Sequence, residues 1–127
     1  MQIVNISKSN NGNIDRFEKI SNSTQEILKK LGLTKNESKV YLYLNKNGSA
    51  KAKIIAQNQK IPRTQTYHLL NELQNKGIVT MICGTPTKFK GIECEKALDV
   101  LINNEIKRIE ELQLMRNELS ELWKAKF

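Results

Sequence analysis

Polar side chains rich in hydrogen-bond donors and acceptors cluster on one predicted helix, between Arg63 and Asn71. The helix is predicted to begin at Pro62, whose missing N–H is tolerated in a first turn, and to end at Gly77. At the helical period, Thr66, Leu69, Leu70 and Leu73 fall on one side and face a core. Arginine pairs with guanine, and asparagine or glutamine with adenine, through two hydrogen bonds each. The side chains predicted to contact bases or phosphates are Arg63, Thr64, Gln65, Tyr67, His68 and Asn71.

Two lysine pairs are predicted to extend this surface. Lys88 and Lys90 are two residues apart on a predicted strand, so they share one face and form a basic wing. Lys51 and Lys53 lie in the first turn of a helix predicted over residues 50–58, where the helix dipole favours acids. A DNA phosphate would relieve that cost, and simple solvent exposure is the alternative explanation. For Tyr67, partial packing into the core is as compatible with the pattern as a phosphate contact.

Other chemistries find little support in the residue types. His68 is the single histidine and no CxxC motif occurs, so a structural metal is not expected. No carboxylate or serine signature accompanies His68, so neither an enzyme nor a cofactor is predicted. Cys83 lies beside the tip of the predicted hairpin and Cys94 far from it, beyond the roughly 7 Å Cα separation of a disulfide. Two reduced thiols are predicted, with a redox switch as the alternative.

Positive charge is concentrated in the same region. Residues 49–93 hold seven basic and two acidic side chains, which is +5 of the total net charge of +8, whereas residues 94–127 have a net charge of −1. Such a distribution is typical of a protein that approaches phosphates with one face. No apolar run approaches the roughly 20 residues of a membrane span, and residues 1–6 are too short and polar for a signal peptide. A cytoplasmic protein without membrane contact is expected.

The elements around these residues predict a mainly α fold with a small β-hairpin. Ser23 with Glu26, and Thr34 with Glu37, each form a capping box that begins a helix, and glycines end both helices. After the two helices described above, residues 78–82 and 87–92 form a hairpin around the turn Gly84–Pro86. The order predicts a winged helix-turn-helix domain over residues 23–93. Residues 1–22, rich in Asn, Ser and Lys, are expected to form a mostly disordered tail, with packing of Phe17 and Ile20 onto the domain as the alternative for its inner edge.

The remainder, residues 94–127, predicts one long helix without Gly or Pro over most of its length. Its apolar seam repeats at heptad-like spacing but is interrupted by Glu105 and Arg116. A domain this small cannot bury so long a seam, so a homodimer through this helix is predicted. The alternative is a helix folded back along its own domain. The predicted dimer interface consists of Leu98, Ile102, Ile109, Leu112, Leu119 and Trp123.

An ordered set of short motifs resembles the N-terminal DNA-binding domain of archaeal TrmB-type transcriptional regulators, over about residues 24–101. The motifs are Leu31-Gly32-Leu33-Thr34 with Glu37 and Tyr41, Ile61-Pro62-Arg63-Thr64 with Tyr67 and Leu70, Leu73 with Lys76-Gly77-Ile78-Val79, and Gly84, Pro86 and Lys88-Phe89-Lys90 leading to Ala97-Leu98.

This resemblance implies a dimeric repressor or activator that binds double-stranded DNA. Larger members of the family continue into a sugar-binding domain, whereas this chain ends at Phe127, so the resemblance implies no sugar effector. Lys51, Lys53 and Ile54 also depart from the capping Ser or Thr and acid usual at the start of that helix. The competing expectation is a winged helix that binds another protein of the transcription machinery, because winged helices serve both purposes.

Overall fold

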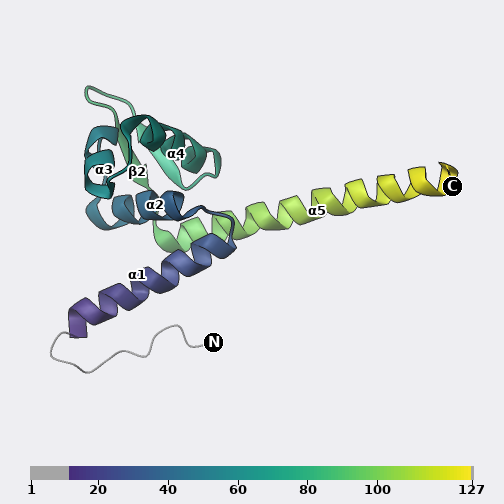
Figure 1. Cartoon of the computed structure of the whole chain (residues 1–127), viewed down its shortest axis with the longest axis horizontal. Helices are drawn as coiled ribbons and strands as arrows, with labels where there is room; N and C mark the ends of the chain where they lie inside the picture. The colour runs from purple at the N-terminus through teal and green to yellow at the C-terminus, as the bar shows by residue number, and fades with distance from the viewer. Residues whose placement is uncertain (1–11, 127) are drawn as a thin grey trace.

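The computed structural model describes residues 12–126, with side chains from Arg16 onward. Figure 1 shows a small domain from which two helices project. No helix within residues 12–126 is long and apolar enough to cross a membrane. The elements in chain order are α1 (Gly12–Lys30), α2 (Lys35–Asn47), α3 (Ala52–Gln59), α4 (Arg63–Asn75), β1 (Val79–Ile82), β2 (Lys88–Gly91) and α5 (Cys94–Lys126).

Helix α1 corrects the sequence prediction for the N-terminal region. It begins at Gly12, so the part of the expected tail from Gly12 to Asn22 is helical, and Ser23 is not an N-cap. The rest of that tail, residues 1–11, lies outside the described residues. A contact with α2 supports the earlier start, because the Lys46 ammonium lies 4.4 Å from the centre of the Phe17 ring. This tertiary contact outweighs the polar composition on which the prediction rested.

The predicted helix boundaries of the central domain are confirmed at α2. The Thr34 hydroxyl accepts from the Glu37 N–H at 3.1 Å, and the Glu37 carboxylate accepts from the Thr34 N–H at 2.7 Å. This is the capping box read from the sequence. Gly48 ends the helix with φ of +81°, which favours glycine. Local sequence therefore determines both ends of α2.

Helix α4 packs as its periodicity predicts. Thr66, Leu69, Leu70 and Leu73 are all buried. The three leucines join a core that includes Tyr41, Leu44, Ile55, Ile78 and Leu101 from four other parts of the chain. Together with α3, α4 forms the helix-turn-helix, and its opposite side is left to solvent.

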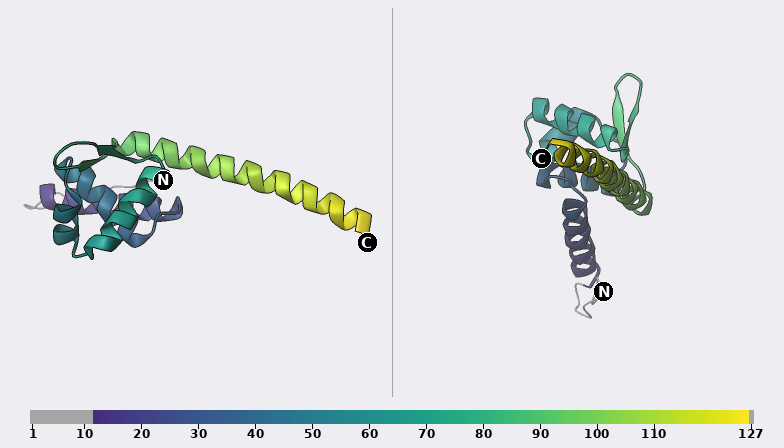
Figure 2. Two further views of the ribbon diagram at one scale, coloured as in Figure 1. Left: turned by 90° about the horizontal axis from the view of Figure 1, so that it is seen from above. Right: turned by 90° about the vertical axis from the view of Figure 1, so that its right-hand side faces the viewer.

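The hairpin is joined to this core through its second strand. β1 and β2 pair antiparallel, with Met81 opposite Phe89 and Thr80 opposite Lys90. Phe89 is buried and also exchanges two backbone hydrogen bonds with Ala50, at 2.8 and 3.0 Å. Lys88 and Lys90 are exposed on the other face of β2, and the hairpin loop projects on the side of the domain away from α1 (Figures 1 and 2). Successive side chains of β2 point to opposite faces, so one face anchors the hairpin to the core through Phe89 and the other carries the two lysines.

Cys83 and Cys94 are both free, in agreement with the predicted reduced thiols. Cys83 is exposed in the loop. Cys94 is half-buried at the start of α5, and burial raises the pKa of its thiol against the opposing effect of a hydrogen bond with Tyr41. A thiol with a raised pKa is less reactive at neutral pH.

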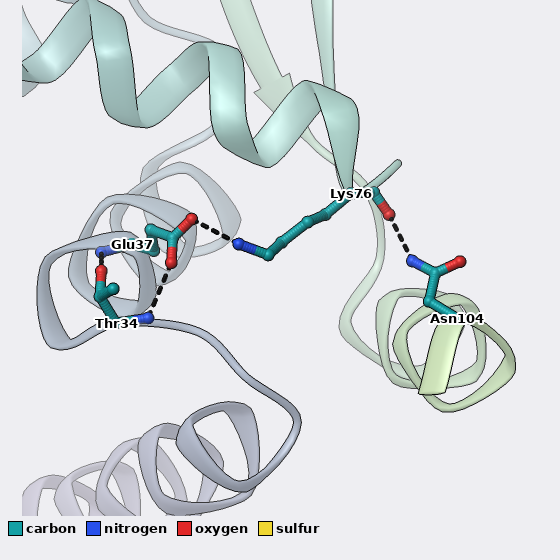
Figure 3. A network of polar contacts seen from close by, with 4 residues as sticks. All are labelled: Thr34, Glu37, Lys76 and Asn104. Carbon is teal, nitrogen blue, oxygen red and sulfur yellow. Dashed lines mark hydrogen bonds and ion pairs between the residues drawn. The ribbon is translucent and has the colours of Figure 1, made fainter. Parts of the chain in front are cut away.

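A network of polar contacts joins α2, α4 and α5 (Figure 3). The Lys76 ammonium lies 2.7 Å from the Glu37 carboxylate, which is only 4% exposed. The backbone carbonyl of Lys76 accepts a hydrogen bond from the Asn104 side-chain amide at 3.0 Å. Lys76 follows the last residue of α4, so this network fixes the end of the helix to both neighbours.

Only the first part of α5 packs against the domain. Ala97 and Leu101 are buried, whereas no residue after Leu101 in the described part of the helix is buried. Leu98 is half-buried and contacts the core. The rest of the helix extends away from the domain (Figures 1 and 2), so it does not fold back along the domain.

The Glu37–Lys76 pair predicts how stability depends on pH. Burial raises the pKa of Glu37, but the hydrogen bonds from Lys76 and Thr34 outweigh it and hold the pKa below its ordinary value of 4.5. Because the pKa is lower in the folded state, the stabilisation is present above about pH 4.5 and is lost as the pH falls through the folded-state pKa.

We expect Lys76→Met to lower the free energy of unfolding by about 2 kcal/mol at neutral pH, because it removes a charged hydrogen bond from a buried carboxylate. Urea unfolding at several pH values measures the effect, and the difference from the unmodified protein should narrow in acid. Lys124→Met, which breaks a surface ion pair with Glu121, is the control and should change little. If Lys76→Met lowered the free energy of unfolding by the same amount at neutral and at acidic pH, the stabilisation would not come from the ionised Glu37 carboxylate.

Candidate nucleic-acid interface

The polar surface of α4 lies opposite its buried side. At the helical period, Thr64, His68 and Asn71 occupy the middle of the outward surface, with Arg63 and Tyr67 along one edge and Gln65 along the other. All six side chains are exposed. The structure thus presents the predicted set on one continuous helix surface, with donors and acceptors directed to solvent.

Arg63 and Tyr67 contact each other on this surface. The guanidinium carbon lies 5.9 Å from the centre of the tyrosine ring, in a cation–π arrangement one helical turn apart. Tyr67 is 47% exposed, so its ring lies outside the core. The spacing of four residues between an arginine and an aromatic residue is the sequence signal for this contact, which the pattern analysis did not use.

The first turns of α3 and α4 carry cations without acids. Lys51 is the N-cap of α3 and Pro62 that of α4; neither provides a side-chain cap, and neither first turn contains an acidic residue. Lys53 and Arg63 line a cavity of about 330 Å³ between the two helices, together with Gln57. Within the described residues, no salt bridge engages these cations. Positive charge at a helix N-terminus is unfavourable unless an anion is nearby.

The wing adds a second basic area. Lys88 and Lys90 are exposed, and no salt bridge in the described part of the chain engages them. Lys90 also lines a cavity of about 570 Å³ beside Asn45 and Lys96, which brings a further cation to the base of the wing. The sequence analysis did not single out Lys96 because it lies on the long helix rather than in the hairpin.

The predicted seam residues of α5 lie apart from this interface. Ile102, Ile109, Leu112, Leu119 and Trp123 are between 43% and 58% exposed. Leu98 differs, because it is half-buried against its own domain. The structure therefore separates a polar basic surface on the domain from an apolar strip on the projecting helix. In residues 12–126 no group of three His, Cys, Asp or Glu side chains is arranged to hold a metal ion.

A helix-turn-helix with an exposed polar second helix and a basic hairpin defines the class of winged-helix DNA-binding proteins. Residues 28–95 match a family described as "Sugar-specific transcriptional regulator TrmB", and the chain belongs to this family. It is 39% identical over 98 residues to the HTH-type sugar sensing transcriptional regulator TrmBL1 of Pyrococcus furiosus. That alignment covers 75% of this chain but only 29% of the relative.

Solved structures support the same fold. The structure of TrmBL2, described as an archaeal chromatin protein with a novel mode of DNA binding, matches with a TM-score of 0.69 at 23% identity, over 84% of this chain and 42% of that one. The transcriptional regulator Tm0710 of Thermotoga maritima matches with a TM-score of 0.54 at 14% identity, over 91% and 92% of the two chains. The second match covers the domain together with most of the projecting helices.

The separation of α4 from the wing predicts two kinds of variant. Replacing Lys88 and Lys90 together by Ala should weaken binding to all DNA sequences about equally, because phosphates carry no base information. Gln65→Ala or Asn71→Ala should instead relax the preference at individual base pairs by roughly 1–3 kcal/mol. Selection from a random duplex library, followed by titration of the selected sites, measures both effects. If the wing variant changed the base preference and the helix variants did not, the wing rather than α4 would read the bases.

Proposed function

We propose that the protein is a transcriptional regulator that binds double-stranded DNA sequence-specifically as a dimer in the cytoplasm. Helix α4 enters the major groove, and the hairpin contacts the phosphate backbone. Arg63, Gln65, His68 and Asn71 meet base edges, while Lys51, Lys53, Lys88 and Lys90 contact phosphates. Thr64 and Tyr67 complete the contact surface. No sugar ligand, cofactor or catalytic step belongs to this proposal.

One observation carries the proposal: basic side chains without acidic partners lie at the N-terminal ends of α3 and α4, where the helix dipoles already place positive charge. Lys53 and Arg63 face one cavity at the start of two helices, with no acid in either first turn. Folding alone gains nothing from this arrangement, whereas a phosphate at this position would be attracted by the side chains and the helix ends together.

A winged helix that binds a protein is the second candidate, and the exposed apolar strand β1 favours it. Met81 and Ile82 are 49% and 44% exposed on the hairpin. A protein-binding wing would lose affinity for its partner when these residues become polar. A DNA-binding wing would tolerate Met81→Ser, since the lysines of β2 make its contacts. Binding to random duplex at low salt distinguishes the two candidates.

We expect DNA binding to depend steeply on salt. If six to ten phosphates are neutralised, affinity should fall by about 10³ to 10⁵ between 50 and 200 mM salt, because bound counterions are released. Fluorescence anisotropy with labelled duplex measures the slope, and the Lys88→Ala, Lys90→Ala double variant should have a shallower one. A flat response, or no binding to any pool of genomic fragments, would reject the DNA-binding function.

The dimer is expected to depend on the exposed strip of α5. Ile109→Glu combined with Leu112→Glu should give a folded monomer, since both side chains are exposed in the single chain, and most DNA affinity should be lost with one half-site. Sedimentation and circular dichroism measure assembly and folding. The matched control is Leu114→Glu, because Leu114 is 63% exposed on the opposite side of the helix. Sedimentation of the unmodified protein as a monomer at micromolar concentration would exclude this interface.

A further inference from the structure

The apolar strip of α5 is interrupted by two charged residues at seam positions. Seam residues follow one another at alternating steps of three and four, the heptad pattern of a coiled coil. Glu105 lies between Ile102 and Ile109 in this pattern, and Arg116 lies between Leu112 and Leu119. A charge in such a seam costs stability unless the partner helix supplies its complement.

Helix direction decides what each charge meets. In a parallel pair the same residues lie at the same level, so Glu105 would face the partner's Glu105 and Arg116 the partner's Arg116. In an antiparallel pair, the two-fold axis can pass between Glu110 and Glu111. Glu105 of each helix then lies level with the partner's Arg116, which gives two such contacts, one on either side of the axis. The same axis places Ile109 level with the partner's Leu112 and Ile102 level with the partner's Leu119. Apolar residues therefore meet apolar residues, and each charge meets its opposite.

We propose that α5 pairs antiparallel with α5 of a second copy, with its direction fixed by two Glu105–Arg116 ion pairs between the subunits. This inference rests on the proposed dimer but not on DNA binding. Within one chain the Glu105 carboxylate is 2.8 Å from Arg108, and the Arg116 guanidinium makes only a 3.3 Å contact with Asn117. Glu105 Oε2 binds Arg108 while Oε1 lies beside Gly32 of its own chain, and the side chain is 34% exposed. The partner's arginine would therefore approach the open side of this carboxylate, and Arg116 has donors to spare.

The antiparallel arrangement also gives the two domains a definite spacing. Each domain holds its own α5 through Ala97 and Leu101, midway at residue 99, which lies level with residue 122 of the partner helix. These levels are 23 residues apart, or about 34 Å at 1.5 Å per residue. A parallel pair would instead place both domains at one level.

Cysteine cross-linking tests the direction without DNA. In a background with Cys83→Ser and Cys94→Ala, single cysteines are introduced by Ile102→Cys and by Leu119→Cys. Antiparallel pairing keeps the two copies of residue 102 about 26 Å apart, far beyond disulfide reach. We expect neither variant alone to form a disulfide dimer on mild oxidation, and a mixture of the two to form a mixed one. A disulfide dimer from Ile102→Cys alone, or no cross-link from the mixture, would overturn the proposal.

Charge exchange tests the ion pairs themselves, again without DNA. Glu105→Arg or Arg116→Glu alone should each raise the dimer dissociation constant by roughly tenfold or more, because two like-charge contacts form. The double variant with both substitutions should restore association, as its charges are complementary again. In a parallel dimer, residues 105 and 116 each face their own copy, so like charges meet in the unmodified protein, in both single variants and in the double variant. A parallel dimer therefore predicts no recovery of association in the double variant. Loss of DNA binding with this pattern intact would reject the DNA-binding function and leave the antiparallel dimer standing.

Discussion

The position of the end of α4 depends on one ion pair, between the buried Glu37 carboxylate and the partly exposed Lys76 ammonium. The carboxylate caps α2 through Thr34 and binds the lysine that follows α4, so one side chain fixes the start of one helix and the end of another. The carbonyl of Lys76 then accepts from Asn104, which joins α5 to the same point. A partly buried pair of this kind contributes less through net energy than through the single arrangement that satisfies it.

Local chemistry made much of the fold predictable. The Thr34–Glu37 capping box, the stop at Gly48 and the apolar side of α4 are properties of consecutive residues, and the structure confirms each. The start of α1 was not predictable in this way, because its polar sequence is stabilised in part by a contact with Lys46 on another helix. The Glu37–Lys76 pair was missed for the same reason: its partners are 39 residues apart, and the sequence explains Glu37 fully by its cap.

The candidate interface shows the same division. The exposure of Asn71 and His68 follows from the helical period alone, as does the shared face of Lys88 and Lys90. The cavity between Lys53 and Arg63 depends on the angle between α3 and α4, which no short pattern contains. The sequence thus identified which side chains are available, and the tertiary structure shows which cations lie together.

The continuity of α5 has a mechanical consequence. Its 33 residues make a rod about 50 Å long, with no glycine or proline to act as a hinge. Because Asn104 connects the rod to the end of α4, a small tilt at its base becomes a displacement of several ångströms at its tip. The converse also holds. A shift at the far end is passed, through the Asn104 hydrogen bond, to the residue that follows α4, so the rod acts as a lever rather than a passive tether.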